Sequence, residues 1–429
     1  MNRRDFIIKS GLSSSIFSIV PSSVLGINGV SPNNKIQIGF IGAGRQGRGL
    51  MKNFTEYNEC QIIAVSDVDS QKVDFFSEEF ENKSLKDNEK KVYIKKFEFY
   101  REMLQNTSID AVVIATPDHW HAQMSVDSAK YGKDIYCEKP LSSTISEGRA
   151  MVNSARKYKV VYQTGSMQRS WKHFRHAAEL IQNGYIGEIK EVNVAIGDPH
   201  KQCDLPSLKA PDHLNWNEWI GPVPYRGYHP DLACLLEDKR WGQWRNYKPF
   251  GGGMITDFGA HMFDIVQWAL EMDNSGPKLF VPPKKNATLG LSYYYDNEVK
   301  VNHIKWGKGN NEIQFIGSEG KLEVSRRYLR TSPDKSLKDL IIPKNATKRV
   351  YQSDNHHLDW LNSIKNRTRP ICDVEIGHRT ASVCNICNIA YDLQRDLEWD
   401  AKKEIFVGDE SANLLIDRPY RGNWNYKEF

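Results

Sequence analysis

The chain has 429 residues, which exceeds one typical domain and favours two domains with peripheral segments. Hydrophobic residues make up 40% and charged residues 26%, a balance typical of a globular protein, and no stretch reaches the roughly 18 apolar residues of a membrane span, so none is expected. The net charge of +5 comes from 58 basic and 53 acidic residues without a long basic run, so nucleic acid is not an expected partner.

Residues 1–26 differ in character from the rest of the chain. Two adjacent arginines, a phenylalanine and a lysine precede a mildly apolar stretch: Arg3, Arg4, Phe6, Lys9 and 11–20. This order is typical of a twin-arginine signal peptide, although a basic tail without that role is the alternative. We therefore expect 1–26 to engage the twin-arginine translocation machinery and to send the folded protein to the periplasm.

From residue 34 to 165, short apolar runs alternate with helical stretches. The expected strands are 36–41, 61–66, 92–94, 111–115, 134–137 and 160–165. The expected helices are 48–57, 71–80, 100–105, 121–131 and 146–158. Such alternation is typical of a parallel sheet with helices on both faces. We predict an α/β fold that begins with a doubly wound, Rossmann-type domain over 34–165.

After about residue 165 the pattern changes to alternating apolar and polar residues. The expected strands are 190–196, 287–295, 299–306, 312–316 and 321–324, and the expected helices are 171–182, 355–364 and 380–393. Turn sequences at 296–297 and 318–320 join several of the strands. This pattern predicts an α+β domain over 166–429 with a large, open, mostly antiparallel sheet and meander connections.

A glycine-rich loop follows the first expected strand and opens the first helix. It consists of Gly42, Ala43, Gly44, Arg45, Gln46 and Gly47. In such a G-x-G-x-x-G loop the first glycine permits a tight turn, the second lets backbone approach a pyrophosphate, and the third lets the helix pack on the strand. The helix N-terminus favours the phosphate charge. The position between strand and helix predicts dinucleotide binding rather than a structural turn.

The preferred dinucleotide follows from a carboxylate at the end of the second strand. Asp67 lies twenty residues after Gly47, where it can accept hydrogen bonds from ribose hydroxyls. Because Asp67 would repel a 2′-phosphate, NAD is favoured over NADP. Arg45 keeps NADP open, since its guanidinium can pair with either a pyrophosphate or a 2′-phosphate.

Three further motifs carry a resemblance to a known family. They are A-T-P-D-H-W-H-A at 115–122, C-E-K-P-L at 137–141 and G-G-G-M-I-T-D-F-G-A-H at 251–261. Together with the glycine loop, they make the chain similar to the Gfo/Idh/MocA oxidoreductases over nearly all of its length after the first segment. The resemblance implies a Rossmann domain that holds a nicotinamide cofactor against a polyol, and a C-terminal domain for substrate binding and oligomerisation.

The same resemblance implies roles for individual residues. Lys139, Asp257 and His261 would line the catalytic centre. The segment with Thr116, Pro117 and His121 would approach the nicotinamide, and Glu138 and Lys139 would lie beside the cofactor.

The chemistry of alcohol oxidation fits these residues. Removing hydride from a carbinol carbon requires that the hydroxyl proton also leave, and a histidine with a pKa near 6.5 suits that task, so His261 is the expected base. The ammonium of Lys139 would stabilise the forming alkoxide. Asp257, four residues before His261 and expected on the same helix face, would orient the substrate or the imidazole.

Other residues carry weaker expectations. Gln168 and Arg169 follow the sixth expected strand and are candidates for substrate contact, with core packing or a surface pair as the alternative. His119 and His121 lack a matching set of cysteine or carboxylate ligands nearby, so no metal site is expected.

The sequence therefore predicts an NAD(P)-dependent oxidoreductase that acts on a hydroxyl or keto carbon of a sugar, glycoside or cyclitol. The alternative is a glycoside-cleaving enzyme that oxidises a ring hydroxyl transiently and then returns the hydride; the presence of Lys139 favours the dehydrogenase, because NAD-dependent glycosidases that resemble this family tend to lack that lysine. A periplasmic enzyme has no free nicotinamide pool, so the cofactor is expected to be tightly bound. The family resemblance also implies a homodimer or homotetramer.

Overall fold

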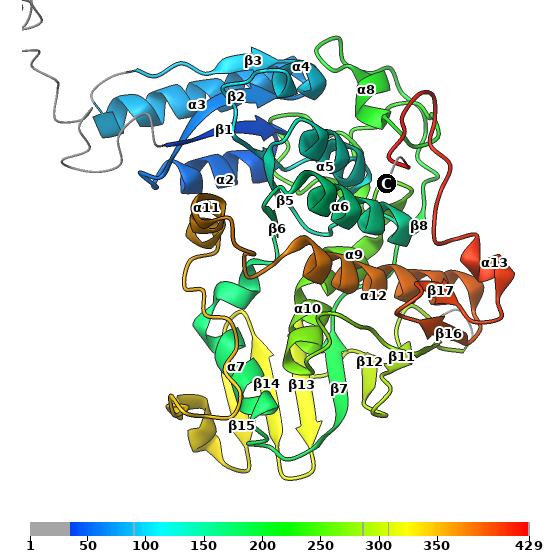
Figure 1. The fold of residues 1–429 in the computed structure, drawn as a ribbon. Helices are drawn as coiled ribbons and strands as arrows, with labels where there is room; N and C mark the ends of the chain where they lie inside the picture. Colours follow the sequence, from blue (N-terminus) through cyan, green and yellow to red (C-terminus); the bar gives the residue numbers. More distant parts are fainter. Residues whose placement is uncertain (1–34, 89–90, 285–286, 308, 428–429) are drawn as a thin grey trace, which may run out of the picture.

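A computed structural model describes residues 35–88, 91–284, 287–307 and 309–427. The expected export signal at 1–26 lies outside these residues. Two domains are visible, a parallel sheet with flanking helices and a larger sheet covered by helices on one face (Figure 1). No helix within the described ranges is both long enough and apolar enough to span a membrane.

In the described part of the first domain, six parallel strands form a sheet of order β3-β2-β1-β4-β5-β6. The strands are β1 Ile36–Ile41, β2 Cys60–Ser66, β3 Lys95–Phe97, β4 Ala111–Ile114, β5 Asp134–Cys137 and β6 Tyr162–Thr164. The helices are α2 Arg45–Phe54, α3 Ser70–Asn88, α4 Tyr100–Leu104, α5 His121–Lys130 and α6 Ile145–Tyr158. This strand order is that of a Rossmann domain, as the sequence predicted.

Most expected elements of this domain are confirmed, with differences at their ends. The third strand is 95–97 rather than 92–94, because Lys95 to Phe97 are the residues that pair with Ala64 to Ser66 of β2. Helix α3 continues to Asn88, eight residues past its expected end. Helix α6 begins at Ile145, one residue before its expected start, because Thr144 and Glu147 form a reciprocal capping box at its N-terminus.

In the described part of the second domain, nine strands form a sheet of order β15-β14-β13-β7-β12-β11-β10-β16-β17. They are β7 Ile189–Ala195, β10 Leu279–Val281, β11 Ser292–Tyr294, β12 Lys300–His303, β13 Glu312–Gly317, β14 Lys321–Ser325, β15 Leu329–Ser332, β16 Leu397–Asp400 and β17 Ile405–Phe406. Neighbours are antiparallel except β7 and β12, which are parallel. The large, mostly antiparallel sheet is as predicted. The connections are not a simple meander, because β7 inserts between β12 and β13.

Helices of the second domain lie on one face of this sheet and at its junction with the first domain (Figure 1). The helices after residue 166 are α7 Lys172–Gln182, α8 Trp216–Ile220, α9 Gly253–Asp257, α10 Gly259–Ala269, α11 His356–Asn366, α12 Val374–Leu393 and α13 Glu410–Asn413. The 3₁₀ turns are η2 Asp118–Trp120, η3 Met167–Ser170, η4 Gln243–Asn246 and η5 Lys335–Asp339, and β8 Lys201–Gln202 pairs with β9 Tyr247–Lys248.

Two of these helices bind the domains together. Helix α11 returns to the first domain, where Trp360 packs edge-to-face on Phe54 and Tyr136. Helix α12 runs between α6 and α10 (Figure 1) and begins at Val374, six residues before the expected start, because Asp373 caps it. Helices α11 and α12 therefore join the second domain to the first.

Candidate active site

A cleft of about 1020 Å³ lies between the two domains. Its first wall contains the loops after β1 and β4, which are the strands where the order of the parallel sheet reverses. Its second wall comes from α9, α10 and the irregular segment 232–246. Ligands of doubly wound sheets bind at this reversal point, so the cleft is the candidate site for cofactor and substrate.

The glycine loop has the geometry that a pyrophosphate requires. Gly42 has φ +102°, and a Cβ at this position would lie 2.6 Å from the carbonyl oxygen of Ala115. A Cβ at Gly47 would collide with the carbonyl oxygen of Gly42, so the helix packs against the turn only with glycine there. A Cβ at Gly44 would meet no atom within 4 Å, which leaves open cleft in front of its backbone. The residues present thus fit a dinucleotide.

Asp67 lines the cleft and also holds the glycine loop. Its carboxylate accepts hydrogen bonds from the backbone N–H of Ala43 at 2.8 Å and of Asp69 at 3.0 Å. Burial raises the pKa of Asp67, and Lys72 partly opposes that shift. The Lys72 ammonium lies 3.2 Å from the Asp69 carboxylate and also lines the cleft. The ribose end of the cleft therefore contains both a carboxylate and a cation.

Arg45 contacts the second domain. Its guanidinium donates to the carbonyl oxygen of Lys239 at 2.6 Å and lies 4.6 Å from the ring centroid of Trp241. Both partners belong to segment 232–246, all of which lines the cleft; we call it the covering segment. The glycine loop and the covering segment are therefore in direct contact over the cleft.

Lys139 and Asp257 form an ion pair between the domains. The Lys139 Nζ lies 2.5 Å from Asp257 Oδ1 and 3.0 Å from the backbone oxygen of Asp257. The second carboxylate oxygen, Oδ2, lies 3.4 Å from Nε of Arg245. Burial disfavours the charged form of Asp257, but Lys139 and Arg245 outweigh it, so the pKa of Asp257 lies below its ordinary value. Asp257 is therefore ionised at neutral pH.

Asp257 and His261 do not lie on one uninterrupted helix, contrary to expectation. Helix α9 ends at Asp257, and α10 begins at Gly259. The backbone N–H of His261 donates to Phe258, three residues back, rather than to Asp257. The carbonyl oxygen of Asp257 thereby remains available for Lys139.

His261 is 3% exposed and lines the cleft. Burial, followed by the charges of Lys139 and Arg326, lowers its pKa well below the ordinary value. Within the described ranges its Nδ1 atom has no hydrogen-bond partner. The imidazole is therefore neutral at physiological pH.

The remaining motif residues are connected by hydrogen bonds. The ring nitrogens of His121 lie 2.8 Å from the carbonyl oxygen of Pro140 and 3.0 Å from that of Thr116. Burial lowers the pKa of His121 to about 4. His121 thus joins the loops after β4 and β5, while the cleft wall contains Thr116 and Pro117.

Glu138 is tied to the glycine loop. Its Oε1 accepts a hydrogen bond from Nε2 of Gln46 at 2.7 Å. Burial raises the pKa of Glu138, while Lys139 and Gln46 oppose the shift. Both partners of this hydrogen bond line the cleft, so the E-K-P loop and the cofactor loop form one surface.

Gln168 and Arg169, the two candidates for substrate contact, point to protein partners. Gln168 Oε1 accepts from Nε of Arg326 at 2.8 Å, and Gln168 Nε2 lies 3.4 Å from the carbonyl oxygen of His261. Arg169 is 1% exposed and pairs with Asp264 at 2.8 Å and with Asp273 at 2.7 Å. Neither residue belongs to the cleft wall.

Several cleft residues had no assigned role in the sequence analysis. Asp118 is buried beside the ion pair, and burial together with Asp257 raises its pKa well above the ordinary value. Arg326 lies in the turn between β14 and β15, and Arg245 lies in the covering segment beside Trp244. Asp118 could have been found from its place in the T-P-D-H motif. No local pattern indicates that Arg245 or Arg326 reaches the centre.

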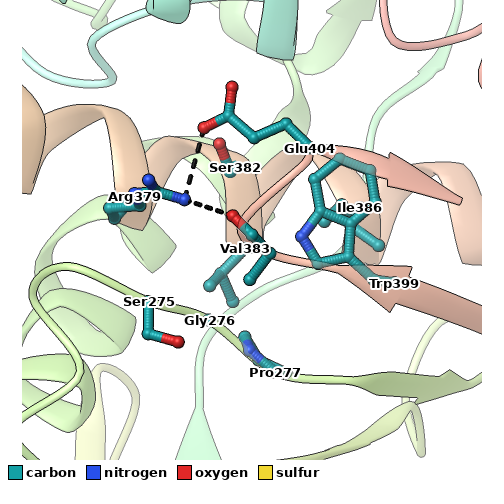
Figure 2. Close-up of a pocket in the computed structure, with 10 residues that line it drawn as sticks. Ser275, Gly276, Pro277, Arg379, Ser382, Val383, Ile386, Trp399 and Glu404 are labelled. Atoms are coloured by element: carbon teal, nitrogen blue, oxygen red, sulfur yellow. Dashed lines mark hydrogen bonds and ion pairs between the residues drawn. The ribbon is translucent and has the colours of Figure 1, made fainter.

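A smaller pocket lies apart from this cleft. Figure 2 shows it between α12, β16 and the residues before β10, with Arg379 directed toward Glu404. Its volume is about 10 Å³, and it shares no lining residue with the large cleft. That is room for about one water molecule, too little for a substrate. Among the described residues, no group of three or more histidine, cysteine or carboxylate side chains is arranged to hold a metal ion.

The fold and the cleft together define a two-domain protein whose first domain is a dinucleotide-binding Rossmann domain. The family model for the oxidoreductase family, NAD-binding Rossmann fold, matches residues 36–166, and the model for the oxidoreductase family, C-terminal alpha/beta domain, matches 199–426. The chain therefore belongs to the Gfo/Idh/MocA oxidoreductase family.

Relatives within the family have different functions. The chain is 26% identical over 165 residues to myo-inositol 2-dehydrogenase of Thermotoga maritima, which covers 38% of this chain and 46% of that protein. It is 30% identical over 171 residues to a glycosyl hydrolase family 109 protein of Shewanella pealeana, covering 36% and 37% of the respective chains. The chain thus matches less than half the length of these curated relatives.

Solved structures share the fold at low identity. Scyllo-inositol dehydrogenase from Lactobacillus casei, with bound NAD(H) and scyllo-inositol, aligns with a TM-score of 0.55 at 17% identity, over 85% of this chain and 99% of that one. Aldose-aldose oxidoreductase from Caulobacter crescentus aligns with a TM-score of 0.58 at 16% identity, over 85% and 99%.

Proposed function

We propose that the protein is an NAD-dependent oxidoreductase that acts on a hydroxyl or keto carbon of a sugar, glycoside or cyclitol. The observation that carries this proposal is the meeting of the Lys139 and Asp257 ion pair with His261 in a cleft that also contains the glycine loop. When bound, the nicotinamide accepts or supplies hydride. Relatives that act on inositol agree with a polyol as substrate.

In this proposal His261 takes the hydroxyl proton. Its imidazole is neutral, because burial and two neighbouring cations lower its pKa, so it is ready to accept a proton. His261 lines the cleft, so its imidazole can meet a substrate hydroxyl there.

Lys139 stabilises negative charge on the substrate oxygen, and Asp257 positions Lys139. The two contacts from Asp257 to Nζ fix the ammonium, which has a third N–H to donate. An ammonium held in advance needs no reorganisation when charge develops, which is the condition for effective electrostatic stabilisation.

The test is a substrate panel with two readouts. Absorbance at 340 nm reports net oxidation of sugars, glycosides and cyclitols, and a product assay reports free aglycone. Net absorbance change without aglycone release supports the dehydrogenase. Aglycone release without net absorbance change would instead support the glycoside-cleaving cycle, the second candidate, which the 30% identity to a glycosyl hydrolase family 109 protein favours.

We propose further that the cofactor is NAD and that it stays bound. Two observations support retention of the cofactor. Every residue of the covering segment lines the cleft, and Arg45 connects this segment to the glycine loop. Asp67 supports NAD over NADP, because a 2′-phosphate would meet its carboxylate. The protein should be denatured and its supernatant analysed by chromatography. A cofactor-free preparation that turns over only with added NADP would contradict both the choice of NAD and the retention of the cofactor.

Export and assembly complete the proposal. The sequence of residues 1–26 supports twin-arginine export to the periplasm, and replacing Arg3 and Arg4 with lysine should leave the protein in the cytoplasm on cell fractionation. Periplasmic protein in that variant, or none in the parent, would contradict export.

Helices cover one face of the nine-stranded sheet, which supports a homodimer or homotetramer through the other face. A monomer in sedimentation at micromolar concentration would contradict assembly.

A further inference from the structure

Arg326 is held in the cleft by a short turn of the second domain. It lines the same cleft as Lys139 and His261, although it comes from the connection between β14 and β15. The turn closes with a 2.9 Å hydrogen bond from the N–H of Ser325 to the oxygen of Tyr328. The ring Nε2 of His173 lies 2.8 Å from the oxygen of Ser325. The backbone that carries Arg326 is therefore fixed from two sides.

The guanidinium itself is also fixed. Its Nε donates to Gln168 at 2.8 Å, and its central carbon lies 5.1 Å from the ring centroid of Phe258 and 5.6 Å from that of Trp171. Gln168 is fully buried and contacts the backbone of His261. The Gln168 side chain thus sets the position of Arg326 relative to the expected base. The Nη groups of Arg326 have no hydrogen-bond partner in the part of the chain that the structure describes.

The cations at this end of the cleft differ in their carboxylate partners. Lys139 and Arg245 share the carboxylate of Asp257. No carboxylate of the described residues lies within 4 Å of Arg326, whereas Arg169 in the neighbouring helix region has two. Asp118 also lies at this end of the cleft, where burial and the charge of Asp257 raise its pKa. Lys139, Arg245 and Arg326 therefore share this end of the cleft with the carboxylates of Asp257 and Glu138, and neither of these carboxylates pairs with Arg326.

We propose that the substrate is a carbohydrate that carries a carboxylate, and that Arg326 binds this carboxylate while the reacting hydroxyl lies between Lys139 and His261. This inference rests on the proposed function and names its substrate class. The two Nη groups of one guanidinium match the two oxygens of a carboxylate in a bidentate contact. A phosphate dianion fits less well, because Lys139 and Arg245, the other cations nearby, are already paired with Asp257.

The experiment compares acids with neutral analogues that have the same ring. The probes are D-glucuronate and D-galacturonate, their methyl esters, the parent hexoses and D-glucose 6-phosphate. Binding to the full-length protein loaded with NADH is measured by calorimetry, and turnover with NAD is followed at 340 nm. We expect at least one acid to bind about 10- to 100-fold more tightly than its ester, since hydrogen bonds to charged groups have this strength.

Two variants assign the preference to Arg326. Arg326→Gln should reduce the ratio of acid to ester affinity to near one, and Arg326→Lys should keep part of it. Arg327→Gln is the matched control: Arg327 is exposed in the same turn but does not line the cleft, so the ratio should stay at the parent value.

Each outcome decides the inference. Equal binding of acids and esters, stronger binding of the sugar phosphate than of both acids, or a preference that survives Arg326→Gln would overturn it. Turnover of neutral sugars alone would overturn it and leave the proposed function intact. Acid binding that depends on Arg326, without hydride transfer to any probe, would uphold it and count against the proposed function.

Discussion

The backbone oxygen of Asp257 accepts a hydrogen bond from Lys139 at 3.0 Å, in the place where an uninterrupted helix would present it to the N–H of His261. The junction between α9 and α10 at Phe258 makes this contact available. Asp257 therefore holds Lys139 through both its backbone and its side chain, and Lys139 lines the same cleft as His261.

Replacing Asp257 with asparagine tests this arrangement. Asp257→Asn would keep the backbone contact but lose the charge that holds Lys139, so we expect kcat to fall by about 10- to 100-fold, while cofactor binding changes little. The acid limb of the profile of kcat against pH should also move, because the variant lacks the Asp257 charge in the cleft that contains His261. A parent-like kcat in a folded variant would show that the ion pair is not needed.

The glycine loop offers a matched series. Gly44→Ala adds a Cβ that meets no protein atom, so the variant should fold normally but bind NAD more weakly by at least about tenfold, because the Cβ occupies the space that a pyrophosphate needs. Gly49→Ala also adds a Cβ in open space, in α2 and away from the cleft wall. It should bind NAD normally and gain about 0.5 to 1 kcal/mol of stability. Equal NAD affinity in both variants would refute the loop assignment.

Arg169 is expected to stabilise the fold rather than to contact the substrate. Arg169→Met would leave Asp264 buried without its partner and should lower the free energy of unfolding by about 3 to 5 kcal/mol. Arg175→Met removes an ion pair with the exposed carboxylate of Asp354 and should cost about 1 kcal/mol or less. Urea unfolding measures both. If Arg169→Met keeps parent stability and raises KM alone, Arg169 contacts the substrate after all.

Buried histidines should make the protein sensitive to mild acid. Burial lowers the pKa of His119 and His356 to about 3, and that of His121 and His357 to about 4, from 6.5 in the unfolded chain. Between pH 6.5 and about 4 the unfolded state binds more protons, so stability falls as the pH falls through this window. Each histidine contributes up to about 1.4 kcal/mol per pH unit.

Denaturant unfolding at pH 7.5, 6 and 5 measures this slope. His357→Phe keeps an aromatic ring against Phe54 but removes one titrating group, so its slope should be smaller by one proton. Unchanged stability of the parent protein between pH 7.5 and 5 would contradict the burial of these histidines.

Local patterns predicted the parts of the molecule that local interactions determine. The apolar run 36–41 followed by glycines indicated both β1 and the cofactor loop, since a buried strand and a tight turn have short signatures. The predicted ends of strands and helices were less accurate where strand pairing or capping sets them. The position of β3 is fixed by its register with β2, and the start of α12 by the cap at Asp373.

The tertiary contacts of the site could not be predicted in this way. Arg326 reaches the cleft only because a β-turn of the second sheet faces the first domain. Arg169 does not line the cleft, because its guanidinium pairs with the carboxylates of Asp264 and Asp273. The covering segment has no regular period from which its position over the cleft could be inferred. Such contacts depend on how distant elements pack, which spacing along the chain does not encode.

The central claim is that Lys139 and His261 act together on one reacting hydroxyl. Its most direct test is single-turnover hydride transfer in His261→Ala, Lys139→Met and the double variant, after folding and bound NAD have been verified. Lys172→Met, an exposed lysine of α7, serves as control. We expect the rate to fall by about 10²- to 10⁴-fold without His261 and by about 10²- to 10³-fold without Lys139, with the double variant barely slower than either. Transfer near the parent rate in folded, NAD-loaded single variants would contradict the claim.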